Sequence, residues 1–128
     1  MIAAVRTVEG VVLIDVDDEL VVEGQELPTV DAPVVELPRV VATARSGATI
    51  AAVVDRRPPV AISRDNGSTW SEAGGGLPTG FAIAIAEDDP DRMLFAGRNR
   101  IYVSVNGGIF WRALTVELPD VLAVAWID

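Results

Sequence analysis

The sequence has no cysteine, no histidine and no lysine among its 128 residues. Without cysteine, the chain can form neither disulfides nor thiolate metal sites. Without histidine, it lacks the commonest general base and the commonest zinc ligand. We therefore expect no metal site and no cofactor.

Long apolar runs are also absent, although 50% of the residues are hydrophobic. No run approaches the roughly 20 residues that span a bilayer. The first ten residues lack the charge order of a secretory signal, because Arg6 follows the apolar residues instead of preceding them. The sequence therefore predicts a folded, cytoplasmic domain without a membrane segment.

Charge of one sign dominates, with 19 acidic and 10 basic residues and a net charge of −9. All ten basic residues are arginine. Acidic residues combined with arginine suit a surface that stays soluble in concentrated salt, as in halophilic archaea that accumulate salt in the cytoplasm. The alternative is a genome rich in G and C, which favours arginine codons over lysine codons. Repulsion by phosphate groups argues against binding to nucleic acid or to anionic membranes.

An eight-residue segment recurs 41 residues later. SRDNGSTW at residues 63–70, the first box turn, is echoed by SVNGGIFW at residues 104–111, the second box turn. Leu-Pro pairs at 37–38, 77–78 and 118–119 keep nearly the same step. A fixed period of this length is typical of repeat folds. It divides the chain into units of about 1–39, 40–79 and 80–119, with residues 120–128 left over.

Each unit is expected to form four short antiparallel strands. Runs rich in β-branched residues begin near Val40, Phe81 and Val121, and each is bounded by Pro, Gly or acidic residues. Later runs at 50–55 and 92–97, and at 59–63 and 100–104, also match between units. In the first unit, which is degenerate, we assign 11–16 to the second strand, 19–24 to the third and 32–38 to the fourth, with 24–29 in place of the box.

The box residues favour a tight, locked turn. Asp65 can accept hydrogen bonds from backbone N–H groups that follow it, Gly67 can take positive φ, and Trp70 can pack back across the hairpin. In the second box turn, Asn106 stands in place of the aspartate and Phe110 in place of the threonine.

This pattern resembles the Asp-box (BNR-type) β-propellers, which include sialidases, sortilin-like receptors and photosystem assembly factors. Small haloarchaeal β-propeller proteins of unassigned function are similar as well. The resemblance implies that the box joins the third and fourth strands of a blade and serves the fold. It assigns this structural role to Ser63, Asp65, Gly67, Thr69 and Trp70, and to Ser104, Asn106, Gly108 and Trp111.

The predicted architecture is all-β, with three four-stranded antiparallel propeller blades in the chain. Closed propellers need about four to eight blades, so a two-fold homodimer with six blades is expected. The run that begins at Val121 can donate an inner strand to the first unit of a partner. Alternatively, residues 2–6 supply that strand, and the C-terminal run is surplus.

Arg56, Arg57, Arg98 and Arg100 occupy equivalent hairpins and are predicted to share one end of the propeller. Arginine forks suit carboxylate and phosphate groups, so they can form a patch for another protein or an acidic ligand. The alternative is that they are solubilising charges paired with nearby acids.

Catalysis is not favoured by the remaining residues. Sialidases need an arginine cluster with a tyrosine nucleophile, whereas Tyr102 is expected within a strand. Other glycosidases need two converging carboxylates, but the acidic segments 15–19 and 87–91 are typical of solvated turns, not of catalytic or calcium sites. We therefore expect a non-enzymatic scaffold or binding module for a protein partner. The alternative is a small propeller that binds or hydrolyses a glycan, or that binds an anionic ligand.

Overall fold

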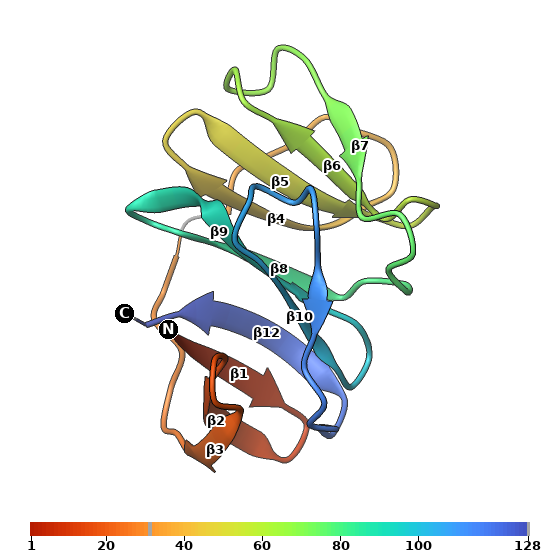
Figure 1. Ribbon diagram of the computed structural model, residues 1–128. Coiled ribbons are helices and arrows are strands. Elements are labelled where there is room, and N and C mark those ends of the chain that lie inside the picture. The colour runs from red at the N-terminus through yellow and green to blue at the C-terminus, as the bar shows by residue number, and fades with distance from the viewer. Residues whose placement is uncertain (31, 128) are drawn as a thin grey trace.

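The computed structural model describes residues 1–30 and 32–127, in which twelve strands form three four-stranded antiparallel sheets (Figure 1). We call these sheets blades. The first blade has the order β12 (Val121–Trp126), β1 (Ile2–Thr7), β2 (Gly10–Asp15) and β3 (Leu20–Glu23). The second blade has β4 (Val40–Ser46), β5 (Thr49–Val54), β6 (Val60–Ser63) and β7 (Ser71–Ala73). The third blade has β8 (Ala82–Ala86), β9 (Asp89–Ala96), β10 (Ile101–Ser104) and β11 (Arg112–Ala113).

The first blade is completed by the C-terminal strand of the same chain. β12 pairs antiparallel with β1, from Ala3 opposite Trp126 to Thr7 opposite Val121, with a bulge after Arg6. β12 is thus the inner strand, as the run at Val121 suggested, but its partner strand lies in its own chain. Residues 2–6 lie in the second strand, so neither of the two arrangements expected for the chain ends is the one observed.

The strand assignment within the first unit was therefore wrong by one position. β2 and β3 are the third and fourth strands of the blade, not the second and third, and residues 32–38 form no strand. The turn between the third and fourth strands is at 16–19, not at 24–29. There, Asp15 Oδ1 accepts hydrogen bonds from Asp17 N at 3.0 Å and Asp18 N at 3.3 Å. The error arose because the β12–β1 pairing, which fixes each strand's position, joins opposite ends of the sequence.

The blades follow one another in the spatial order second, third, first (Figure 1). Two apolar clusters join them. Ile62 and Phe95 belong to the cluster between the second and third blades. Ile14 and Leu94 belong to the cluster between the third and first. The repeated Leu-Pro pairs contribute directly, because Leu77 and Leu118 are both buried in these clusters. Burial of these side chains is the main force that holds the blades together.

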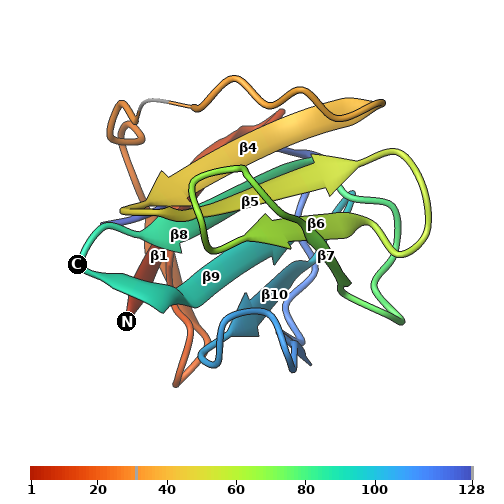
Figure 2. The same ribbon diagram turned by 90° about the horizontal axis from the view of Figure 1, so that it is seen from above.

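A connecting segment, residues 24–39, leads from β3 of the first blade back to β4 of the second (Figures 1 and 2). Gly24 lies over Leu13 and Val11 of β2, on the side of the sheet away from Ile14. Farther along, the Thr43 hydroxyl donates a hydrogen bond of 2.8 Å to the carbonyl oxygen of Pro33. The segment therefore contacts both terminal blades of the arc. In the part of the chain that is described, no helix is long and apolar enough to cross a membrane.

Candidate functional site

The antiparallel order of the strands divides the connecting loops between two ends of the molecule. One end carries the loops at residues 8–9, 55–59, 74–81, 97–100 and 114–120, which join second to third strands and fourth strands to the next inner strand. The last two residues of the connecting segment, 38–39, lie directly before the inner strand β4 at the same end. Together, these segments hold five of the ten arginines but only four of the nineteen acidic residues. We call this the arginine end. The remaining turns form the opposite end, which is strongly acidic.

The two predicted arginine hairpins meet at the second Leu-Pro pair. Arg57 Nη1 donates a hydrogen bond of 3.0 Å to the carbonyl oxygen of Leu77. Gly97, which begins the other hairpin, lies so close to Pro78 that a Cβ added to it would be 3.1 Å from the Pro78 ring. The structure therefore brings the hairpins of adjacent blades together on one surface.

Two of the four predicted arginines are paired with acids. Arg98 Nε lies 3.2 Å from Asp120 Oδ1, and Arg100 Nη2 lies 3.3 Å from Glu117 Oε1. Arg100 Nη1 also donates to the carbonyl oxygen of Leu114 at 3.1 Å. Such exposed pairs typically contribute only about 0–1 kcal/mol, so a competing carboxylate can replace the acid partner. Arg98 and Arg100 therefore agree in part with the alternative interpretation, in which the hairpin arginines are solubilising charges paired with nearby acids.

Arg39 and Arg56 form the unpaired part of the arginine end. The Arg39 carbonyl oxygen accepts a hydrogen bond of 2.9 Å from Asp55 N, which places Arg39 beside the hairpin that carries Arg56. Both side chains are exposed, and neither guanidinium has a partner among residues 1–30 and 32–127. Sequence analysis missed Arg39. The signal for it was its place directly after the first Leu-Pro pair.

The first box turn is held by the side chains of Ser63 and Asp65. Ser63 Oγ accepts a hydrogen bond of 2.8 Å from Gly67 N. Asp65 accepts from Thr69 N at 2.8 Å and from the Thr69 hydroxyl at 2.5 Å. Hydrogen bonds from Thr69, and then from the Ser63 hydroxyl, favour the charged carboxylate and lower the pKa of Asp65 to about 2. Gly67 has the positive φ, 93°, that the turn requires.

The second box turn has the same backbone hydrogen bonds without the aspartate. Gly108 N donates to Ser104 Oγ at 2.8 Å, and Phe110 N donates to Asn106 Oδ1 at 3.0 Å. The Trp111 indole N–H donates to the Gly108 carbonyl oxygen at 3.1 Å. In the first turn, Trp70 is likewise half-buried beside its glycine. Both turns are therefore compact and locally satisfied, with side chains free only at their outer positions.

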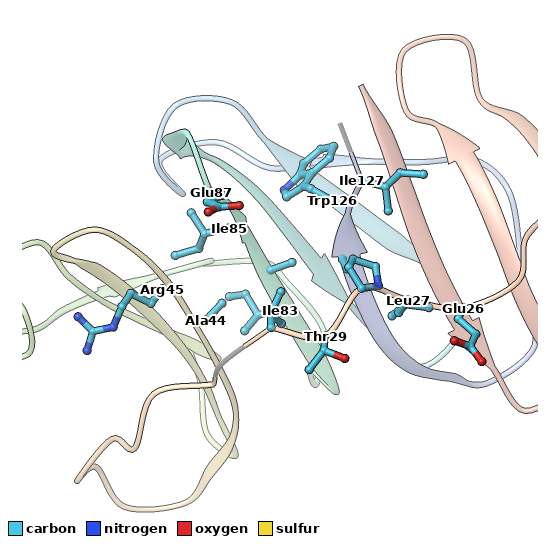
Figure 3. Close-up of a pocket in the computed structure, with 14 residues that line it drawn as sticks. Glu26, Leu27, Thr29, Ala44, Arg45, Ile83, Ile85, Glu87, Trp126 and Ile127 are labelled. Atoms are coloured by element: carbon cyan, nitrogen blue, oxygen red, sulfur yellow. The ribbon is translucent and has the colours of Figure 1, made fainter.

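The inner strands and the connecting segment enclose an open cavity of about 840 Å³ (Figure 3). Its wall is mostly apolar, from Ala44, Ile83, Ile85 and Ala125 of the three inner strands. Trp126 also lines it and is 9% exposed, with an indole N–H that has no hydrogen-bond partner among the described residues. The guanidinium of Arg92 lies over this ring, 4.6 Å from the ring centre.

The polar groups of the cavity are more acidic than basic. Glu26 and Glu87 line it together with Arg45, whose guanidinium donates a hydrogen bond to Asn66. This arrangement favours a hydroxylated or cationic ligand over an anion. No group of three potential metal-ligating side chains occurs among the residues that the structure describes. Sequence analysis did not find this cavity, because the segment 24–39 had been assigned to the first blade.

Tyr102 lies in β10 and packs edge-on against Phe95, with ring centres 5.8 Å apart. Its ring is half-buried against the cluster between the second and third blades. The side chain is thus part of the packing between blades, away from the cavity lining.

Comparison with known proteins finds solved structures whose fold is similar to that of this chain. No protein family model and no curated protein matches the chain. Among solved structures, YCF48 from Cyanidioschyzon merolae is similar at 24% identity with a TM-score of 0.52, over 89% of this chain and 33% of that one. The GH74 enzyme of Niastella koreensis is similar at 21% identity with a TM-score of 0.54, over 94% of this chain and 18% of that one. This chain thus spans a third or less of each.

Both of these structures are β-propellers, and at this level of identity the similarity shows the fold alone. Together with the three sheets, it confirms the predicted fold class. The chain is an all-β protein of three four-stranded antiparallel propeller blades.

Proposed function

We propose that this chain is a non-enzymatic β-propeller binding module that engages an acidic segment of another protein through its arginine end. The single observation that carries the proposal is the pair of exposed, unpartnered guanidinium groups of Arg39 and Arg56. Around them lie Arg57, Arg98 and Arg100. Arg57 donates to a carbonyl oxygen, and Arg98 and Arg100 form weak, exposed ion pairs. In a chain of net charge −9, this end is the place where a carboxylate-rich segment meets attraction instead of repulsion.

The test replaces the two unpaired arginines. The variant Arg39→Asn/Arg56→Ser keeps a residue that tolerates the positive φ of 63° at position 39. We expect its affinity for a fluorescein-labelled, glutamate-rich peptide to fall about tenfold, because two charge-assisted contacts are lost. Fluorescence anisotropy against increasing salt measures this loss.

The matched control changes net charge equally but elsewhere. Arg6→Ser/Arg45→Ser removes two exposed arginines outside the arginine end, and its affinity for the peptide should stay within about twofold of wild type. Equal loss in the control, or equal binding of a glutamine-rich counterpart peptide, contradicts the proposal.

A second copy of the chain is the other partner that we propose, completing a six-bladed ring as a homodimer. Support comes from the outward side of the first blade, where Leu20 and Val22 are 64% and 59% exposed beside Leu13. Exposed apolar residues on a sheet surface are typical of an interface. In high salt at micromolar concentration, sedimentation should give twice the chain mass of 13.6 kDa, and Leu20→Ser/Val22→Ser should reduce it to the single-chain mass. A wild-type chain that sediments only as monomer contradicts the dimer.

We also propose that the chain is a member of the Asp-box group and that it comes from the cytoplasm of a halophilic archaeon. The support is the repeated hydrogen bonding of the two box turns and the arginine-only, strongly acidic composition.

A second candidate function is favoured by the cavity between the inner strands. Its apolar wall, the Trp126 ring and the carboxylates of Glu26 and Glu87 suit an uncharged glycan better than an anionic ligand. Glycoside hydrolysis at this place would require two of these carboxylates to converge on one bond.

A further inference from the structure

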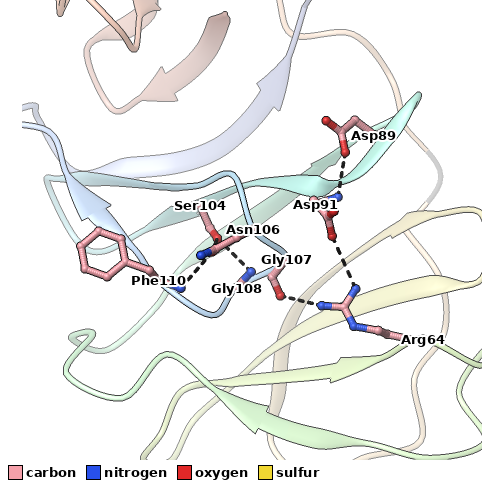
Figure 4. Close-up of polar contacts among 8 residues, drawn as sticks. All are labelled: Arg64, Asp89, Asp91, Ser104, Asn106, Gly107, Gly108 and Phe110. Atoms are coloured by element: carbon pink, nitrogen blue, oxygen red, sulfur yellow. Dashed lines mark hydrogen bonds and ion pairs between the residues drawn. The ribbon is translucent and has the colours of Figure 1, made fainter.

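The second box turn presents three large apolar side chains to solvent at the end opposite the arginine end. Val105, Ile109 and Phe110 are 64%, 83% and 68% exposed. In Figure 4, the ring of Phe110 points away from the hydrogen-bonded residues of the turn. We call these three residues the apolar tip. Contiguous exposed apolar residues on a surface loop typically mark an interaction site.

The first box turn shows that the backbone conformation does not require these apolar residues. At the three equivalent positions it has Arg64, Ser68 and Thr69. Both turns nevertheless have the same hydrogen bonds to the serine hydroxyl and to the Asx side chain. The apolar tip is therefore additional to what the turn needs for its own stability.

An acidic hairpin is fixed beside the apolar tip. The Asp91 carbonyl oxygen accepts a hydrogen bond of 2.9 Å from Gly107 N. Asp89 Oδ1 accepts one of 3.0 Å from Asp91 N (Figure 4). Arg64 donates to the Gly107 carbonyl oxygen at 2.9 Å and lies 3.9 Å from Asp91 Oδ1, so the hairpin, the second box turn and the second blade are tied together.

The neighbouring carboxylates remain available. Glu87, Asp88 and Asp89 are all exposed on this hairpin. The ion pair of Arg64 is with Asp91 and not with any of these three. The apolar tip thus stands at the edge of a patch of negative charge that is held in place by backbone hydrogen bonds. Such a patch attracts cations and repels anionic lipid.

We propose that the apolar tip and the hairpin at 87–91 form a second docking site, which binds a protein segment that carries both apolar and basic side chains. The apolar side chains of that segment cover Ile109 and Phe110, while its Arg or Lys residues pair with the exposed carboxylates of the hairpin. The negative charge of the hairpin favours this occupant over two others. The hairpin carboxylates repel an anionic membrane, and they also repel the same carboxylates on the tip of a second copy. The site is on the opposite end from the proposed acidic-segment site and does not depend on it.

The test uses a fluorescein-labelled amphipathic peptide of leucine and arginine, with two matched peptides in which arginine is replaced by glutamate or leucine by serine. The variant Ile109→Ser/Phe110→Thr restores the residues of the first box turn at both positions and leaves the charge unchanged. We expect wild type to bind the leucine-arginine peptide and this variant to bind it at least about tenfold more weakly, as is typical when central apolar anchors are truncated. Asp88→Asn/Asp89→Asn should weaken binding less and reduce its salt dependence.

Two control variants test whether the peptide binds at the apolar tip. Val8→Ser/Val34→Ser removes two exposed valines elsewhere and should bind like wild type, as should Arg39→Asn/Arg56→Ser. Equal binding of the serine-arginine peptide, or unchanged binding by Ile109→Ser/Phe110→Thr, overturns the docking site. If wild type binds zwitterionic vesicles and Ile109→Ser/Phe110→Thr does not, the tip binds a membrane and the proposal is overturned. If wild type self-associates and this variant does not, the tip binds a second copy and the proposal is likewise overturned.

Discussion

A chain that stops after residue 120 is expected not to fold. The deletion removes β12, which is the inner strand of the first blade and pairs with the β1 edge opposite β2. It also removes Val121, Val124 and Trp126 from the cluster between the third and first blades. Burial of each large apolar side chain contributes about 1.5–3 kcal/mol, whereas domains of this size have a total stability of roughly 5–15 kcal/mol. Near-ultraviolet circular dichroism in high salt, together with binding of an apolar dye, measures the loss of packing.

A circular permutant provides the control for this deletion. Ile127 N donates a hydrogen bond of 3.1 Å to the Ile2 carbonyl oxygen, so a short linker can join the two ends of the chain. New ends between residues 35 and 36 lie in the connecting segment, outside every strand. This permutant retains all twelve strands, now with β12 directly before β1, and should fold. A folded deletion variant would contradict the central place of β12 in the first blade.

The repeat made the second and third blades predictable from sequence. The runs beginning near Val40 and Phe81 became the inner strands β4 and β8, and the two boxes became turns between third and fourth strands. These features depend on local patterns, namely β-branched runs, turn residues and a constant step. The first blade could not be assigned in the same way, because its register depends on Val121 meeting Thr7 across the whole length of the chain.

The candidate sites divide along a similar line. The hairpin arginines at 57 and 98 were placed on a common end by their equivalent positions, and that end is where the structure has them. Arg39 escaped notice because it follows a segment that had been counted as a strand. The sequence shows that the residues of the apolar tip differ between the two box turns. The structure is needed to show that the side chains of Ile109 and Phe110 are exposed and not part of the core. Sequence periodicity reports which face a strand residue takes and says little about a turn.

Replacing Phe95 by alanine is expected to cost about 3–5 kcal/mol of unfolding free energy, as for other fully buried phenylalanines. The Phe95 ring is completely buried between the second and third blades and packs edge-on against Trp111, with ring centres 6.0 Å apart. The space around it is filled, since a Cβ added to Gly80 would lie 2.5 Å from the ring. The cavity left by the substitution is thus bounded by two sheets that cannot both move inward. Urea unfolding at high salt measures the change.

The same substitution at Phe110 is the matched control, because that ring is 68% exposed and its turn is held by backbone hydrogen bonds to the Asn106 side chain. We expect Phe110→Ala to change stability by no more than about 0.5 kcal/mol, while it weakens binding of the leucine-arginine peptide. The pair of variants therefore separates the two roles that phenylalanine has in this chain. Phe95 holds adjacent blades together, and Phe110 is held by the blade for contact with a partner. A stability loss at Phe110 comparable to that at Phe95 would show that the apolar tip serves the fold instead.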